Sequence, residues 1–217
     1  RNEDFPSFSG RVLRGYTLIL STYAGYFGAG YACKSLYDLT GDNRAKQVCM
    51  DIGDVILHHC ARNNLGLVMH DDRENGFTIP DVAYFVVPPL FLAMAVDDKN
   101  AVAFKRQAEI QLKNFMDLFL DRDKKLVKTL YRGGSLGETY WIRANGWLLW
   151  AITEALDYVD KESALQGEIR IALDLLAQGL ESCQDLSGGF HLLIDDKTMP
   201  LETTGSIMIA NSIHKAV

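Results

Sequence analysis

The sequence predicts an all-α protein in which helical hairpins stand side by side in a two-layer ring. Apolar residues recur with helical spacing through most of the 217-residue chain. Polar turns, TGDN at 40–43 and DDKN at 97–100, separate successive helical stretches at equivalent places. In each later pair one helix is apolar nearly all round and the other on one face only. Inner helices buried on both sides and outer helices buried on one would show this pattern.

Two helices are expected after an irregular lead-in at residues 1–15. The first follows the long apolar stretch from Tyr16 to Leu39, whose glycines allow close packing but weaken a helix. The second begins after an aspartate cap in the TGDN turn and extends to about Cys60. Its apolar residues lie on one face: Val48, Ile52, Val55 and Ile56.

The next hairpin follows a polar, glycine-containing loop at 61–80. The very apolar segment 82–96 predicts an inner helix. Its Pro88-Pro89 pair must either kink the helix or begin it, because a proline inside a helix costs roughly 3 kcal/mol. After the DDKN turn, a helix with one apolar stripe is expected, formed by Phe104, Ala108, Leu112, Phe115 and Phe119.

The second half of the chain repeats the alternation. A short extended piece, LVKTLY, and a glycine-rich loop lead to a helix that starts within YWIRANGW and is apolar nearly all round. An amphipathic helix is expected at about 161–181, and a loop with a small extended segment at 185–196. A last helix should run from about Glu202 to the end of the chain.

Composition and net charge argue against several classes of partner and indicate a cellular location. Hydrophobic residues make up 48% of the chain, which predicts a packed globular protein, and the net charge of -6 without a basic tract argues against nucleic acid and anionic membranes as partners. No apolar run is long enough to cross a bilayer. A reducing, cytoplasmic location is expected from four cysteines that form no CxxC pair and no zinc spacing. The chain begins at Arg1, which leaves open that a signal segment was removed.

The stretch Tyr140–Trp150 concentrates the residues that suit sugar chemistry. Two tryptophans flank Arg143, and such a set can hold a sugar ring and its carboxylate. YWIRANGW is followed by GGFHLLIDD and LETTGSIMIANSI. In that order and separation, these elements resemble the signature of the family 105 glycoside hydrolases, the unsaturated rhamnogalacturonyl hydrolases. The family pattern is W-x-R-G-N-x-W, then G-x-W-[HY]-Q-x-L-D and L-E-T-S-G-T-A-M-F.

The resemblance implies an (α/α)6 barrel, with six hairpins and twelve helices. About seven helices are expected here, in a single domain over 1–217 that is a partial, incomplete toroid. An open partial ring would leave apolar inner faces exposed, which favours self-association.

The resemblance also implies the site. Asp81 matches the family's general acid/base, and the expected substrate binders are His70, Trp141, Arg143, Asn145, Trp147 and His191. No metal or cofactor is implied. Arg143 would hold the uronate carboxylate through two parallel hydrogen bonds. Trp141 would stack on the sugar.

The implied substrate is the 4,5-unsaturated uronic sugar that a polysaccharide lyase leaves at a chain end. One carboxyl can protonate C4 and then help water add at C5, so a second carboxyl at fixed separation is not required. Asp81 must be protonated to begin, which needs a pKa raised by apolar neighbours. Three places depart from the family pattern: Ile79 replaces a tryptophan, Phe85 a methionine, and Tyr131–Gly133 a Y-H-G-like motif.

Other interpretations of the same residues stay open. Asp81 could simply cap the helix that follows, Arg143 could be a structural ion-pair partner, and Asn145 could cap local backbone. Trp147 suits core and site equally, whereas Trp150 suits the core. The alternative functions are an unsaturated glucuronyl hydrolase of the related family 88 and a non-catalytic carbohydrate-binding helical module.

Overall fold

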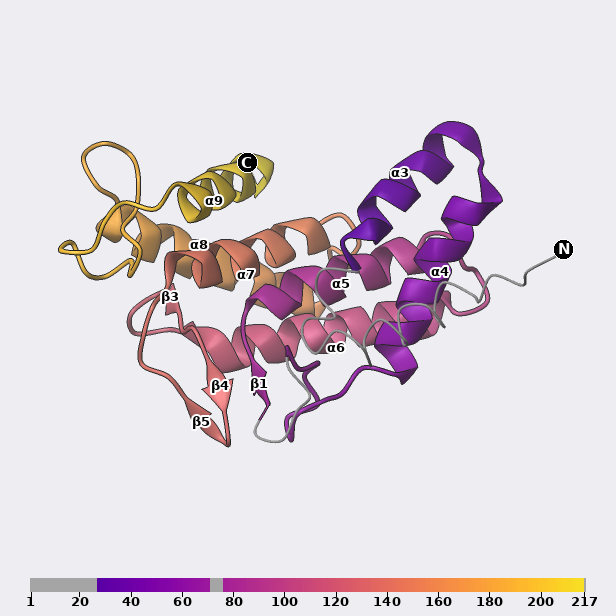
Figure 1. Ribbon diagram of the computed structural model, residues 1–217, viewed down its shortest axis with the longest axis horizontal. Helices are drawn as coiled ribbons and strands as arrows, with labels where there is room; N and C mark the ends of the chain where they lie inside the picture. The colour runs from indigo at the N-terminus through magenta and orange to yellow at the C-terminus, as the bar shows by residue number, and fades with distance from the viewer. Residues whose placement is uncertain (1–26, 71–75, 217) are drawn as a thin grey trace, which may run out of the picture.

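The computed structural model of the chain describes residues 27–70 and 76–216 (Figure 1). This part contains seven helices, which confirms the expected all-α architecture, while the proposed helix start at Tyr16 lies outside the described residues. The helices are α3 (Ala29–Thr40), α4 (Asn43–His58), α5 (Asp81–Met94), α6 (Ala101–Phe119), α7 (Ile142–Ala155), α8 (Ala164–Cys183) and α9 (Thr203–Ala216).

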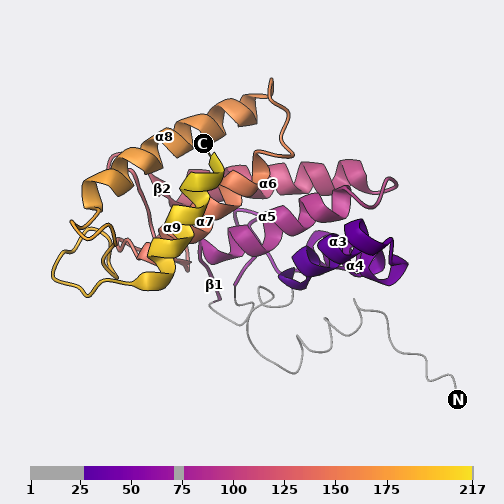
Figure 2. The same ribbon diagram turned by 90° about the horizontal axis from the view of Figure 1, so that it is seen from above.

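The helices form two layers, as their hydrophobic patterns predict. Helices α5 and α7 bury residues on nearly every side, whereas α6 and α8 bury one face. Helix α5 packs against α4, α6 and α7, and α7 in turn packs against α9. Figure 2 shows α6 and α8 along one side of the molecule, with α5, α7 and α9 inside them. Helices α5 and α7 therefore form the inner layer of the described structure.

Local signals set several helix ends. Asp42 caps α4 by accepting the backbone N–H of Arg44 at 2.8 Å, as the TGDN turn predicts. Ser163 caps α8 in the same way through Gln166. Helix α3 ends at Gly41, which adopts a left-handed conformation with φ of 69° that only glycine takes without strain.

Helix α5 continues through its two prolines. It begins at Asp81 and contains Pro88 and Pro89, so the prolines do not start the helix. Pro88 lacks the N–H that would otherwise bind the carbonyl of Tyr84, four residues earlier. The Tyr31 hydroxyl donates to that carbonyl at 3.5 Å instead. Tertiary packing thus supplies the partner that the local sequence removes.

Short strands connect the loops at one end of the helices. Strands β1 (Phe77–Thr78), β4 (Tyr131–Arg132) and β5 (Ser135–Leu136) form an antiparallel sheet in the order β1-β4-β5. Strand β2 (Leu120–Asp121) pairs with β3 (Leu126–Val127), which includes the start of the expected extended piece. The first sheet joins the segment that precedes α5 to the glycine-rich loop that precedes α7. The two inner helices therefore begin side by side.

The cysteines and the helix lengths were also subjects of prediction from the sequence. All four cysteines are free thiols, and Cys49 and Cys60 are buried. Among the described helices, none combines the length and the hydropathy that a bilayer crossing requires.

Candidate active site

Asp81 is the first residue of α5, and its carboxyl is largely withdrawn from water. Pro80 takes the cap position, and no side chain caps this helix, so the expectation that Asp81 acts as an N-cap is wrong. Its Oδ1 atom is buried and has no hydrogen-bond partner among the described residues. A buried polar atom without a protein partner is rare, because it loses its hydration without compensation. Within the described residues, the burial of this oxygen is therefore uncompensated.

Burial raises the pKa of Asp81 from 3.8 to about 6. Three smaller effects oppose the rise: the residue's own backbone N–H, the charge of Arg143, and a hydrogen bond from the Trp147 side chain. A carboxylic acid with a pKa in this range carries its proton in a substantial fraction of molecules at mildly acidic pH. It can donate that proton and take one back, as a general acid/base requires.

Arg143 lies in the first turn of α7 and contributes the positive charge of the site. Its guanidinium carbon lies 4.0 Å from the centre of the Trp141 ring, so the cation stacks on the indole. Its Nε atom lies 4.0 Å from Oε1 of Glu202, while 42% of the side chain remains exposed. The guanidinium is oriented by two neighbours and keeps a face open to an anionic ligand.

Aromatic rings form the floor beneath these two residues. Tyr84 contacts Trp147 at a centroid separation of 5.1 Å and Trp150 at 4.5 Å, and Phe85 contacts Trp147 at 5.1 Å. These rings come from α5 and α7, one or two turns below Asp81 and Arg143. Trp147 also hydrogen-bonds to Asp81, so this group of rings adjoins the carboxyl. Phe85 belongs to the group although it departs from the family pattern.

The start of α7 is held by the loop that follows α8. The backbone N–H of Ile142 donates to Leu192 at 3.1 Å, and that of Ile194 donates to Tyr140 at 2.8 Å. Deeper in the contact, a Cβ atom on Gly205 would lie 2.7 Å from Cγ1 of Ile142, so only glycine allows α9 to approach this closely. The two motif segments that lie far apart in the sequence are therefore joined directly.

Of the two roles expected for Asn145, binding substrate and capping local backbone, its contacts correspond to the second. Its side chain is completely buried. The carboxamide oxygen accepts the N–H of Val127 at 2.8 Å, and the amide nitrogen donates to the carbonyls of Val127 and Trp141 at 3.4 and 3.0 Å. Asn145 thus fastens β3 to the first turn of α7 and reaches no surface in the described structure.

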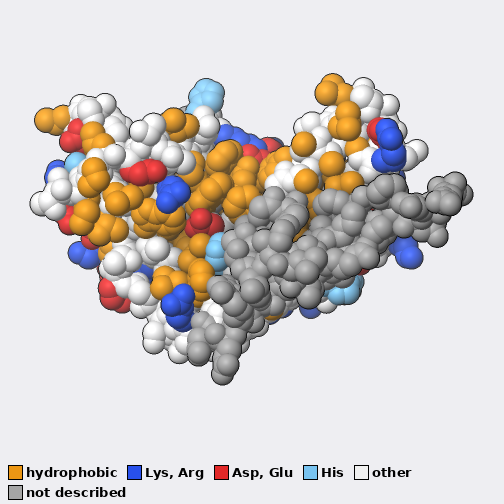
Figure 3. All heavy atoms as spheres, viewed as in Figure 1, with side chains coloured by type: hydrophobic (Ala, Val, Ile, Leu, Met, Phe, Trp, Pro, Cys, Tyr) orange, Lys and Arg blue, Asp and Glu red, His pale blue; other side chains and the backbone are white. Residues whose placement is uncertain are grey.

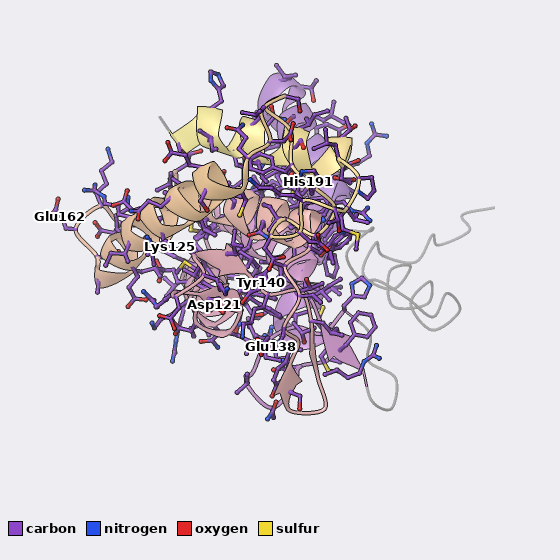
Figure 4. The ribbon with its side chains drawn as sticks, turned by 90° about the vertical axis from the view of Figure 1, so that its left-hand side faces the viewer. Asp121, Lys125, Glu138, Tyr140, Glu162 and His191 are labelled. Atoms are coloured by element: carbon purple, nitrogen blue, oxygen red, sulfur yellow. The ribbon has the colours of Figure 1, made fainter. Side chains whose placement is uncertain are left out.

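His191 is engaged by its own loop. Its Nδ1 atom is hydrogen-bonded to the carbonyl of Met199, and Nε2 lies 3.8 Å from a carboxylate oxygen of Asp185. Figure 4 shows His191 on the segment beside α9, above Tyr140 and Asp121, which are hydrogen-bonded at 2.7 Å. With 8% of its surface exposed, His191 supports the loop that holds α7.

His70 lies at the opposite rim, next to the sheet. Its backbone N–H donates to Phe77 at 2.8 Å, and its ring lies 5.0 Å from the Phe77 ring. The Arg132 guanidinium lies 4.8 Å above the same ring. Pairing of β1 with β4 thus brings one departure from the family pattern, at Tyr131 and Arg132, next to Phe77, which the His70 ring also contacts. Ile79, another departure, packs against the core.

A carboxyl, a guanidinium and stacked aromatic rings therefore converge at the starts of α5 and α7. Figure 3 shows hydrophobic side chains gathered over the centre of this face, where α5 and α7 lie in Figure 1. A separate groove of about 460 Å³ lies between α7, α8 and α9, but no aromatic ring lines it. Sequence reasoning named Tyr84 as an apolar neighbour of Asp81 but assigned no role to Glu202. The LETTG element, used only to identify the family, contains Glu202.

Comparison with known proteins identifies a glycoside hydrolase family and a related hydrolase. Residues 21–217 match the family described as Glycosyl Hydrolase Family 88. The unsaturated rhamnogalacturonyl hydrolase YesR of Bacillus subtilis (strain 168) is 23% identical over 194 residues, which cover 85% of this chain and 55% of YesR.

Solved structures share the fold. A possible GH105 family member from Klebsiella pneumoniae subsp. pneumoniae MGH 78578 superposes with a TM-score of 0.78 at 21% identity, covering 88% of this chain and 51% of its own. The unsaturated glucuronyl hydrolase of Bacillus sp. GL1 superposes with a TM-score of 0.71 at 14% identity, covering 95% and 59%. The chain spans about half the length of these proteins, and the match over residues 21–217 shows that it belongs to glycosyl hydrolase family 88.

Proposed function

We propose that the protein removes a 4,5-unsaturated uronic acid from the non-reducing end of oligosaccharides produced by a polysaccharide lyase. The observation that carries this proposal is the buried Asp81 carboxyl, whose Oδ1 has no partner among the described residues and whose pKa is raised to about 6. Such a group beside an available arginine suits a reaction in which an anionic sugar must receive a proton.

The residues suggest a sequence of steps. Arg143 binds the uronate carboxylate while Trp141 or Trp147 contacts the ring. Asp81 donates its proton to C4 of the double bond, and positive charge develops at C5, next to the ring oxygen. The resulting Asp81 carboxylate takes a proton from water as the oxygen of that water bonds to C5. The product is a hemiketal, which opens and releases the aglycone, so Asp81 ends protonated as it began.

The substrate range is a further part of the proposal. The name of the B. subtilis relative supports a rhamnogalacturonan-derived substrate. The unsaturated glucuronyl hydrolase of Bacillus sp. GL1, which covers 95% of this chain, supports a glycosaminoglycan-derived one. Arg132 and His70, whose side chains both contact Phe77, are the residues that we propose distinguish the sugars that follow the uronate.

A direct test follows the ultraviolet absorbance of the double bond in lyase-generated pectin and glycosaminoglycan oligosaccharides. The wild-type protein should bleach this absorbance, and Asp81→Asn should abolish the bleaching while circular dichroism shows a retained fold. Asp98→Asn is the matched control, because Asp98 is an exposed carboxylate just beyond the other end of α5. Binding of the sugars without bleaching would instead establish a non-catalytic carbohydrate-binding module.

A further inference from the structure

Glu202 is fixed in place at the junction between the last loop and α9. One of its carboxylate oxygens, Oε2, accepts the backbone N–H of Gly205. Its own backbone N–H donates to Phe190 at 2.9 Å, and its carbonyl accepts the hydroxyl of Ser206 at 2.7 Å. Only 19% of the side chain is exposed. The carboxylate therefore has little freedom to move, and its second oxygen, Oε1, points to Arg143.

The contact between Glu202 and Arg143 is an ion pair rather than a hydrogen bond. Oε1 lies 4.0 Å from Nε, beyond hydrogen-bonding distance, and Nε is buried without a hydrogen-bond partner among the described residues. The guanidinium plane lies on Trp141 at 4.0 Å. A guanidinium carries one N–H on Nε and four on its terminal nitrogens. Glu202 thus attracts the guanidinium of Arg143 at Nε and leaves the two terminal nitrogens for a ligand.

We propose that Glu202 is the positioning residue for Arg143, and that it sets the preference of the site for a charged uronate over a neutral sugar. The proposal rests on the proposed function. A flexible arginine loses rotamer freedom when it binds, which weakens the interaction. Held between an indole face and a fixed carboxylate, Arg143 meets the substrate already oriented. Glu202 itself touches no reacting atom, so its effect should fall on binding rather than on the chemical step.

The experiment compares Glu202→Gln with Ser206→Ala on two substrates, an unsaturated uronide and its methyl ester. Glutamine keeps an oxygen for the N–H of Gly205 but removes the charge that faces Arg143. Ser206→Ala disturbs the same junction without facing Arg143. For a partly exposed pair, Glu202→Gln should raise KM for the acid about fivefold and leave kcat within about twofold, while KM for the ester stays constant. Ser206→Ala should leave the ratio of the two KM values unchanged.

A double-mutant cycle tests whether Glu202 acts on substrate binding through Arg143. Once Arg143→Ala has removed the guanidinium, Glu202→Gln should produce no further change in KM for the acid. The proposal is overturned if Glu202→Gln raises KM for acid and ester alike, if it raises neither, or if its effect persists in the Arg143→Ala background.

A second measurement needs no activity and separates this proposal from the proposed function. The Nε–H resonance of Arg143, assigned by its loss in Arg143→Lys, should exchange with water several-fold faster in Glu202→Gln than in the wild type or in Ser206→Ala. Unchanged exchange refutes the positioning role even if the enzyme is active. Conversely, a protein that shows the exchange effect but neither binds nor bleaches any unsaturated uronide refutes the proposed function alone.

Discussion

Replacing the carboxyl of Asp81 by an amide should stabilise the folded protein at neutral pH while it abolishes hydrolysis. Burial raises the pKa of Asp81 from 3.8 to about 6, so the folded state holds this proton more tightly than the unfolded chain. Because the folded state binds more protons between these values, the free energy of unfolding falls as pH rises from about 4 to about 6. Below this pH range Asp81 is protonated in both the folded and the unfolded state, so it no longer changes the free energy of unfolding.

The shift of roughly two pH units corresponds to about 3 kcal/mol at about 1.4 kcal/mol per unit. This is an upper limit, since the side chain keeps some access to water. Asp81→Asn removes the cost because its amide does not ionise. The free energy of unfolding of the variant should therefore approach that of the wild type at about pH 3 and exceed it by up to about 3 kcal/mol above pH 7.

Urea unfolding followed by tryptophan fluorescence at the two pH values measures the difference. Asp98→Asn, which changes an exposed carboxylate just beyond α5, is the matched control. If Asp81→Asn is less stable than the wild type at pH 7.5, attraction between the carboxylate and Arg143 outweighs its desolvation. The reasoning that makes Asp81 a protonated acid would then be refuted.

Three more outcomes follow from the contacts of the site. The rate of uronide hydrolysis should fall as pH rises through about 6, since Asp81 must start protonated; a pH–kcat profile that stays flat to pH 8 would contradict this. Asn145→Ala should lower the free energy of unfolding by about 3 kcal/mol, because it leaves the buried N–H and carbonyl of Val127 unpaired, and a loss below 1 kcal/mol in urea titration would argue against it. Gly205→Ala should cost about 1 to 3 kcal/mol through its contact with Ile142, whereas Gly167→Ala, with open space around it, should be neutral or slightly stabilising by calorimetry.

The sequence was sufficient for the helices and for most of the residues around the site. Helical periodicity depends on neighbours three and four positions away, so it identified the inner and outer helices directly. Local hydrogen-bonding chemistry was also readable, as the Asp42 cap of α4 shows. The family motifs pointed to Asp81, Trp141 and Arg143, because proton transfer and carboxylate binding each require a particular side chain.

Tertiary structure decided what each of those side chains does. Asn145 and Trp147 are two positions apart in the same motif. Asn145 fastens β3 to α7, whereas Trp147 hydrogen-bonds to Asp81. His191 is satisfied within its loop, which no spacing could show. Glu202 lies beside Arg143 only because α9 packs against α7. Desolvation and ion pairing depend on atoms brought together across the whole chain, whereas a sequence pattern records only those that are close along it.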